Sequence, residues 1–172
     1  MVNETSEVWQ LILNPHAGGG RGTRDRDKMV RMLKKSGIVL QLSVSQYPGH
    51  SIKLACDLAI QGATRFIVAG GDGTLNTAVN VLRGSHIPLG ILPCGTFNYF
   101  ARYLMLPTAD MDQAIDLAFN APARAIDLPS INDHLFLNNT SLGLYAGVLK
   151  ERERHTAWFG RRRWVAVLSG LL

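Results

Sequence analysis

The feature that most constrains the fold is a regular alternation between short apolar runs and segments with helical spacing of apolar residues. The apolar runs predict strands, and they cover 8–14, 38–45, 65–70 and 87–93. The helical patterns that follow them cover 26–37, 50–62, 74–84, 96–106 and 111–120. Strands that alternate with helices are typical of parallel β-α-β units. The sequence therefore predicts an α/β fold with a parallel sheet that has helices on both faces.

The pattern changes after residue 121. Two short strand-like runs lie on either side of Ser130 to Asp133, and Asn132-Asp133 is typical of a hairpin turn. The segment 146–172 has an amphipathic, helical pattern and an abrupt apolar end. We therefore expect an α/β domain over 1–121 and the beginning of a second, β-rich domain over 122–172, truncated at Leu172.

Composition narrows the class of protein. The chain has 172 residues, of which 47% are hydrophobic and 18% charged, which fits a globular fold with a real core. The N-terminus lacks the pattern of a signal peptide, and no apolar run has the length of a membrane span. Two cysteines, Cys56 and Cys94, are expected to be reduced and buried. These features predict a cytoplasmic protein, and the net charge of +5 suits an anionic ligand or surface.

The first predicted strand ends in Asn14-Pro15-His16-Ala17-Gly18, and more glycines follow. Glycines let a backbone approach a ligand closely and direct N–H groups at a phosphate, with Arg21 and Arg24 near enough to help. The alternative is a flexible connection between strand and helix. The run is neither a Walker A loop nor a GxGxxG fingerprint.

The third predicted strand ends in Gly70-Gly71-Asp72-Gly73-Thr74. A helix that begins near Thr74 would present its free N–H groups and positive dipole end to an anion. Thr74 is expected to cap that helix or to donate its hydroxyl to a phosphate. Asp72 would repel a phosphate, so its expected partner is a ribose hydroxyl, a substrate hydroxyl or Mg²⁺, unless it is an ordinary turn residue or cap.

The fourth predicted strand ends in Pro93-Cys94-Gly95-Thr96, followed by a helix. Thr96 stands where a cap or a phosphate contact is expected. Phe97, Phe100 and Tyr103 have helical spacing, which favours core packing over a surface for base stacking.

Other candidate sites are weaker. His50 could contact a ligand but fits a solvated helix start better, and the histidines have no metal-ligand spacing. The basic run 160–164 could contact anionic lipid or be a solvated helix end. No nucleic-acid partner is expected, and the oligomeric state is left open.

Three ordered motifs resemble the catalytic domain of the diacylglycerol kinase family, which includes sphingosine, ceramide and bacterial lipid kinases. They are Asn14 to Gly18, Gly70 to Asn76 and Gly95 to Arg102. The resemblance implies an N-terminal domain similar to that of phosphofructokinases, then a β-sandwich, with the nucleotide between them. It also implies ATP and Mg²⁺ as cofactors, and a lipid substrate reached by peripheral contact with a membrane.

The resemblance assigns site residues by position. Those expected to contact ATP are Asn14, Pro15, His16, Ala17, Gly18, Ser45, Gly70, Gly71, Asp72, Gly73, Thr74, Leu75, Asn76 and Thr96. Asp72 is also a candidate for a catalytic role, and no metal ligand is assigned. Family members often have Glu at the position of Thr77 and Asp at that of Tyr99, so two carboxylates are replaced.

In the family, the general base comes from the β-sandwich, which here would lie beyond Leu172. We therefore expect an ATP-dependent lipid kinase or its nucleotide-binding fragment. One alternative is an NAD kinase-like enzyme, since those enzymes also use Gly-Gly-Asp-Gly-Thr. Another is an inactive module that binds a nucleotide or a membrane without catalysis.

Overall fold

The computed structural model describes residues 8–19, 26–31, 39–44, 50, 57 and 63–139. The chain divides into two compact units, Met1–Asn138 and Asn139–Leu172, and the elements below all lie in the first. The domain boundary expected after residue 121 stays a prediction, and the amphipathic segment 146–172 lies outside the described residues. Within the described part of the chain, no helix has the length and apolar character needed to cross a bilayer.

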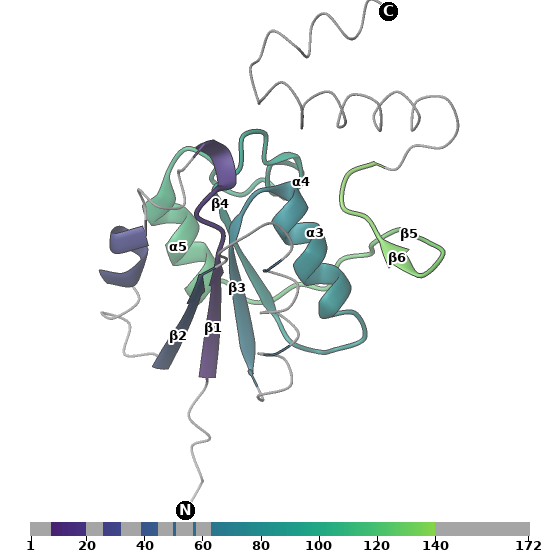
Figure 1. Ribbon diagram of the computed structural model, residues 1–172, viewed down its shortest axis with the longest axis horizontal. Coiled ribbons are helices and arrows are strands. Elements are labelled where there is room, and N and C mark those ends of the chain that lie inside the picture. Colours follow the sequence, from purple (N-terminus) through teal and green to yellow (C-terminus); the bar gives the residue numbers. More distant parts are fainter. Residues whose placement is uncertain are drawn as a thin grey trace, which may run out of the picture. The chain divides into compact units, whose positions relative to one another are not determined.

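A four-stranded parallel sheet forms the centre of the first unit (Figure 1). Its strands are β1 (Val8–Leu13), β2 (Val39–Val44), β3 (Arg65–Gly70) and β4 (Leu89–Pro93), in the order β2-β1-β3-β4. The register places Leu11 opposite both Leu42 and Ile67. The predicted α/β class and the parallel pairing are confirmed, because every neighbouring pair in this sheet is parallel.

Helices cover both faces of the sheet, with α5 (Met111–Asn120) and α3 (Asp72–Val81) on either side of the strands (Figure 1). Alternate strand residues belong to different cores: Leu11 and Ile67 pack with α5, whereas Ile12 and Val68 pack with α3. These apolar residues are almost completely buried, and each stabilises the fold by roughly 1.5–3 kcal/mol. Burial on both faces explains why the central strands β1 and β3 are mostly apolar instead of strictly alternating.

The helix after β3 begins earlier than predicted. Helix α3 starts at Asp72, and its N-cap is Gly71 in an extended conformation. Thr74 is therefore a residue of the first turn, and the expectation that it caps the helix is wrong. The predicted helix 111–120 is confirmed as α5, where the Asp110 carboxylate accepts from the N–H groups of Asp112 and Gln113.

The helix after β4 is shorter than predicted. Helix α4 spans Tyr99–Tyr103, and its N-cap is Asn98 in the left-handed conformation. The difference arises because residues 94–98 form a turn instead of the first turn of a helix. Thr96 thus lies in this turn, away from the capping position.

A short hairpin follows α5 along the chain. Strands β5 (Ser130–Ile131) and β6 (His134–Leu135) are antiparallel, as the sequence predicts. Asn132 and Asp133 both have positive φ, at 46° and 65°, which is the requirement for a two-residue turn of this kind. The predicted turn is therefore confirmed at these two residues.

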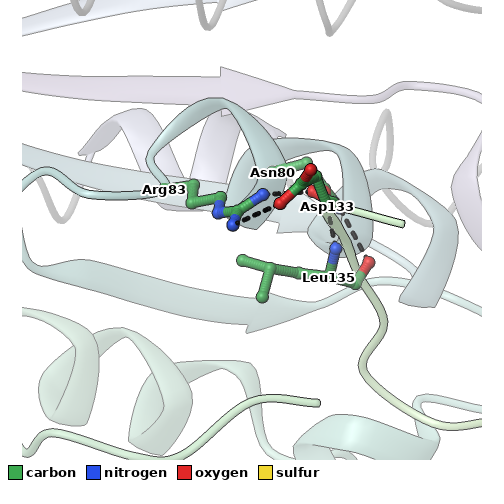
Figure 2. A network of polar contacts seen from close by, with 4 residues as sticks. All are labelled: Asn80, Arg83, Asp133 and Leu135. Carbon is green, nitrogen blue, oxygen red and sulfur yellow. Dashed lines mark hydrogen bonds and ion pairs between the residues drawn. The ribbon is translucent and has the colours of Figure 1, made fainter. Parts of the chain in front are cut away.

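Two side chains hold this hairpin, Asn80 from α3 and Arg83 from the turn that follows α3 (Figure 2). The Asn80 amide donates to the Leu135 carbonyl at 2.9 Å and accepts from the Leu135 N–H at 2.9 Å. The amide thus pairs with the backbone of β6 as a neighbouring strand would. Arg83 donates to the carbonyl and the carboxylate of Asp133 in an exposed contact.

Asn80→Ala is expected to lower the free energy of unfolding by about 1–3 kcal/mol, because it leaves two half-buried backbone groups of Leu135 without partners. Arg83→Ala is the matched control, since its ion pair is exposed and should contribute less than about 1 kcal/mol. Urea unfolding measures both. Equal losses for the two variants would contradict the role assigned to Asn80.

Candidate functional site

Asn14 connects the loop after β1 to helix α3. Its backbone N–H donates to the Ala69 carbonyl, which extends the pairing of β1 with β3 by one residue. Its side-chain oxygen accepts from the His16 N–H at 3.0 Å, and its side-chain nitrogen donates to the Thr74 hydroxyl at 2.9 Å. The first and second predicted motifs are therefore joined by a direct hydrogen bond.

The loop after β1 also rests on the loop after β4. It ends in a short 3-10 turn, Ala17–Gly19, in which Gly18 has a φ of 57°. A Cβ atom at Gly18 would lie 2.2 Å from the Cys94 carbonyl oxygen. Both the conformation and the contact require glycine at this position.

The loops after β3 and β4 touch through their backbones. A Cβ atom added to Gly95 would lie 2.5 Å from the Cα atom of Gly71. The Cys94 N–H donates to the Gly70 carbonyl at 2.9 Å, so the contact continues the pairing of β3 with β4. The structure thus brings the three predicted motifs together at one edge of the sheet, where ligands of open α/β sheets bind.

Asn98 shapes the loop after β4, and the sequence analysis gave it no role. Its side-chain oxygen accepts from the Gly95 N–H at 2.8 Å, and its side-chain nitrogen donates to the Gly95 carbonyl at 3.1 Å. The residue is 3% exposed and left-handed, with a φ of 52°. The sequence signal for this role is an Asn three residues after a glycine in a turn, since Asn tolerates the left-handed conformation better than most residues.

Asp72 holds the start of helix α4. Its two carboxylate oxygens accept from the N–H groups of Tyr99 at 3.2 Å and Phe100 at 3.0 Å. These N–H groups belong to the first turn of α4, which has no side-chain cap of its own from Asn98. The presence of a carboxylate beside loops that are expected to bind an anion is therefore explained by a positioning role, in which Asp72 joins the second motif to the third.

The N-terminus of α3 has the properties of an anion site. Its N-cap, Gly71, makes no side-chain hydrogen bond to the helix, in contrast to Asp110 of α5. Gly73, in the first turn, is exposed, and a Cβ atom there would meet nothing within 4 Å. Uncapped N–H groups, the helix dipole and an open approach fit the phosphates of a nucleotide.

The remaining predicted residues differ in their surroundings. Leu75 is 1% exposed in the core, so its side chain packs against the sheet and offers a ligand only backbone groups. The Asn76 side-chain oxygen is buried without a hydrogen-bond partner. His16 and Thr96 are exposed, and Pro15 is half-buried. Ser45 lies outside the described residues.

A metal ion held by the protein does not fit the described residues. They contain no group of three His, Cys, Asp or Glu side chains that could hold one. The Asp72 carboxylate is already occupied by two backbone N–H groups, and Thr77 and Tyr99 supply no further carboxylate.

Two aromatic residues expected in the core lie on the surface instead. Phe100 is 4% exposed and packs in the core as predicted, but Phe97 is 58% and Tyr103 is 80% exposed. For Phe97 the expectation failed because α4 starts at Tyr99, so Phe97 belongs to the preceding turn and the predicted helical face does not include it. Tyr103 does belong to α4 and stacks on the Phe100 ring, with centroids 6.4 Å apart, but its own side chain stays exposed.

A polar pocket of about 710 Å³ lies beside the loop after β4. Thr96 and Asn98 line it on one side, and Lys28, Arg102 and Thr108 contribute side chains from three other segments. Apart from Lys28, its walls come from the segment between Pro93 and Met111, and the pocket was not predicted because it depends on how this segment folds back on itself.

The described geometry agrees with comparisons to known proteins. The sequence model of the family described as "Diacylglycerol kinase catalytic domain" matches residues 8–131 of this chain. A diacylglycerol kinase of Bacillus subtilis is 31% identical over 131 residues, which are 75% of this chain and 43% of that protein. A Yersinia enterocolitica protein named "Probable lipid kinase YegS-like" is 36% identical over 146 residues, or 82% of this chain and 48% of that protein.

Solved structures give the same result for the fold. The crystal structure of a diacylglycerol kinase from Bacillus anthracis superposes with a TM-score of 0.66 at 29% identity, over 77% of this chain and 46% of that one. The chain spans about half the length of the curated relatives it matches.

Gly95→Ala is expected to destabilise the first unit by about 1–3 kcal/mol, because the new methyl group would overlap the Gly71 backbone and the Asn98 side chain. Chemical denaturation measures the loss. Gly73→Ala is the control, since the same change there meets no atom. A neutral Gly95→Ala variant would show that the two loops do not touch as described.

Asp72→Asn is expected to lower the free energy of unfolding by about 1–2 kcal/mol, since an amide can accept from only one of the two α4 N–H groups. Asp116→Asn, on the exposed face of α5, is the control. Equal melting temperatures for the two variants in thermal unfolding would contradict the role of Asp72 in holding α4.

Proposed function

The chain belongs to the diacylglycerol kinase catalytic domain family, and from this premise we propose that it forms the ATP-binding part of a lipid kinase. The proposed reaction transfers the γ-phosphoryl group of ATP to a lipid hydroxyl and releases ADP. The observation that carries the proposal is the uncapped start of α3, set among three loops at one edge of the sheet.

Each loop has a proposed share in holding ATP. The N–H groups of Gly73 and Thr74 would donate to phosphate oxygens, and the exposed Thr96 hydroxyl would add a contact from the neighbouring loop. Asn14 to Gly18 would lie along the nucleotide, as the family resemblance implies, with Ser45 as a further contact. Asn14 also fixes the Thr74 hydroxyl, so it would orient the phosphate site as well.

Gly70, Gly71 and Asp72 act differently in this proposal. They set the backbone path and the position of α4, so that the N–H groups of α3 stay free of protein partners. The Asn76 side-chain oxygen on α3 is buried and has no hydrogen-bond partner in the protein, so a ligand could supply a donor to it.

Phosphoryl transfer requires more than the donor site. A group must accept the proton of the lipid hydroxyl, and positive charge must balance the phosphates. The family resemblance places the base in the part of the relatives that this chain does not span. Because the described residues do not fit a metal, Mg²⁺ stays a prediction from the resemblance, and no step is assigned to it here.

Gly73→Ala is expected to weaken ATP binding by about tenfold or more while leaving stability unchanged or slightly raised. The added methyl group would project into the open space where phosphates approach, and alanine favours a helix over glycine by roughly 1 kcal/mol. Isothermal titration with ATP measures the affinity. Thr77→Ala, one turn further along α3, is the control and should bind as the wild type does.

Unchanged ATP affinity in Gly73→Ala would refute the assigned phosphate site. A single-turnover assay with radiolabelled ATP then tests the acceptor, with mixed lipids in one reaction and NAD in another. Transfer to lipid supports the lipid kinase, and transfer to NAD contradicts it. ATP binding without transfer to either would support the alternative of a binding module for this chain.

A further inference from the structure

Asn14 is held through its backbone and through both ends of its side chain. Its backbone N–H donates to the Ala69 carbonyl at 3.0 Å, and its carbonyl accepts from the Ala17 N–H at 3.2 Å. Its side chain accepts from the His16 N–H and donates to the Thr74 hydroxyl. A side chain fixed in this way keeps one orientation, so it can impose a direction on the hydrogen bond with its neighbour.

The direction of the Asn14 amide follows from the groups that it faces. A backbone N–H can only donate, so the amide atom that faces the His16 N–H must be the oxygen. The amide nitrogen then faces Thr74, and an amide nitrogen can only donate. The Thr74 hydroxyl oxygen is therefore the acceptor in this pair, and the hydroxyl proton is left for a different acceptor.

Thr74 has two donors that the protein does not use. Within the described part of the chain, no group accepts from its hydroxyl, and no carbonyl accepts from its backbone N–H in the first turn of α3. The next residue, Leu75, is the first of the helix to donate, to the Gly71 carbonyl at 3.0 Å. Thr74 is only 8% exposed, and donors this buried gain free energy when a bound group accepts from them.

Gly70 leaves the space in which the Thr74 side chain lies. A Cβ atom at Gly70 would lie 2.6 Å from the Thr74 Cβ atom and 2.9 Å from its hydroxyl oxygen. The side chain can therefore pack against the end of β3 only because residue 70 is glycine. Gly70 and Asn14 together fix where the hydroxyl lies and which way its hydrogen bonds run.

We propose that Asn14 is a positioning residue of the phosphate site, because its amide makes the Thr74 hydroxyl a donor to a phosphate oxygen. The N–H and O–H of Thr74 would then bind one phosphate together. Hydrogen bonds donated to a charged oxygen are roughly twice as strong as neutral ones, so the direction of this hydroxyl matters to affinity. The inference rests on the proposed function, and it gives Asn14 a role that requires no contact of its own with ATP.

Asn14→Asp separates this role from a purely structural one. An aspartate has nearly the same shape and can still accept from the His16 N–H. It can also accept from the Thr74 hydroxyl, so the two loops would stay joined. The hydroxyl proton would then no longer be available to a ligand, and a negative charge would lie beside the phosphate.

Isothermal titration of the 172-residue chain with ATP tests the proposal. Asn14→Asp should weaken ATP binding by about tenfold or more, and Asn14→Ala by only about threefold, since alanine leaves the hydroxyl free to turn toward the ligand. Urea unfolding should give the opposite order, with Asn14→Asp closer to the wild type in stability. If the aspartate variant bound ATP as well as the wild type, Asn14 would be only a structural contact.

Asn120→Asp is the matched control for the change from an amide to a carboxylate. Asn120 is exposed at the last residue of α5 and is not among the residues of the site. This variant should bind ATP as the wild type does. An equal loss of affinity in Asn120→Asp and Asn14→Asp would show a general effect of charge and would overturn the proposal.

Variants of Thr74 test whether Asn14 acts through the hydroxyl. Thr74→Val removes the hydroxyl with little change in shape and should weaken ATP binding by about tenfold, whereas Thr74→Ser should retain most of the affinity. In the Thr74→Val background, Asn14→Ala should cause no further loss, because residues that act through one interaction are not additive. Fully additive losses would overturn the proposal.

Inorganic tripolyphosphate distinguishes an effect on the phosphates from a direct contact with the nucleoside. Asn14→Asp should weaken tripolyphosphate and ATP binding by the same factor. A loss confined to ATP would assign Asn14 to the base or the ribose and would overturn the positioning role.

Gly73→Ala separates this inference from the proposed function. If Gly73→Ala weakens ATP binding while Asn14→Asp does not, the phosphate site stands and the role of Asn14 is refuted. If both variants bind ATP as the wild type does, the phosphate site itself is refuted, and the inference with it.

Discussion

The close approach of three loop backbones is the constraint on which the rest of this site depends. Gly71 and Gly95 meet with no room for a side chain between them, and Gly18 lies against the Cys94 carbonyl. Parallel pairing of β1, β3 and β4 brings these loops to one edge, but pairing alone leaves strands about 5 Å apart with side chains above them. Glycine at the contacts lets the loops close together, so that backbone N–H groups instead of side chains form the surface of the edge.

Polar side chains then hold the three loops in the close arrangement that the glycines allow. Asn14 joins the first loop to α3, Asp72 joins α3 to α4, and Asn98 closes the turn between β4 and α4. Each uses its polar atoms on backbone or hydroxyl groups of the protein. As a result, the negatively charged Asp72 carboxylate faces the start of α4, and the N–H groups at the start of α3 stay open to an anion. For this reason, an aspartate within the second motif does not conflict with the proposed phosphate site.

The sequence predicted those parts of the fold that follow from local pattern. Apolar runs predicted the strands, and Asn132-Asp133 predicted the hairpin, because each depends on residues adjacent in sequence. The failures came at helix starts. Capping α3 was one of two roles expected of Thr74, but the N-cap is Gly71, which lies against Gly95 of the neighbouring loop. Phe97 was expected in the core, and it is exposed because the Asn98 turn delays α4. The first outcome involves a contact between distant loops, and the second a side-chain turn between Gly95 and Asn98, and helical periodicity contains neither.

The segment after β4 has a buried side and an exposed side close to the proposed phosphate site. Gly95 faces inward, against the loop that precedes α3, while Thr96 is exposed beside it. Phe97, Tyr99 and Tyr103 are exposed within the next seven residues. Because α4 is held by Asp72, which also begins α3, the position of this segment and the proposed phosphate site share one structural support.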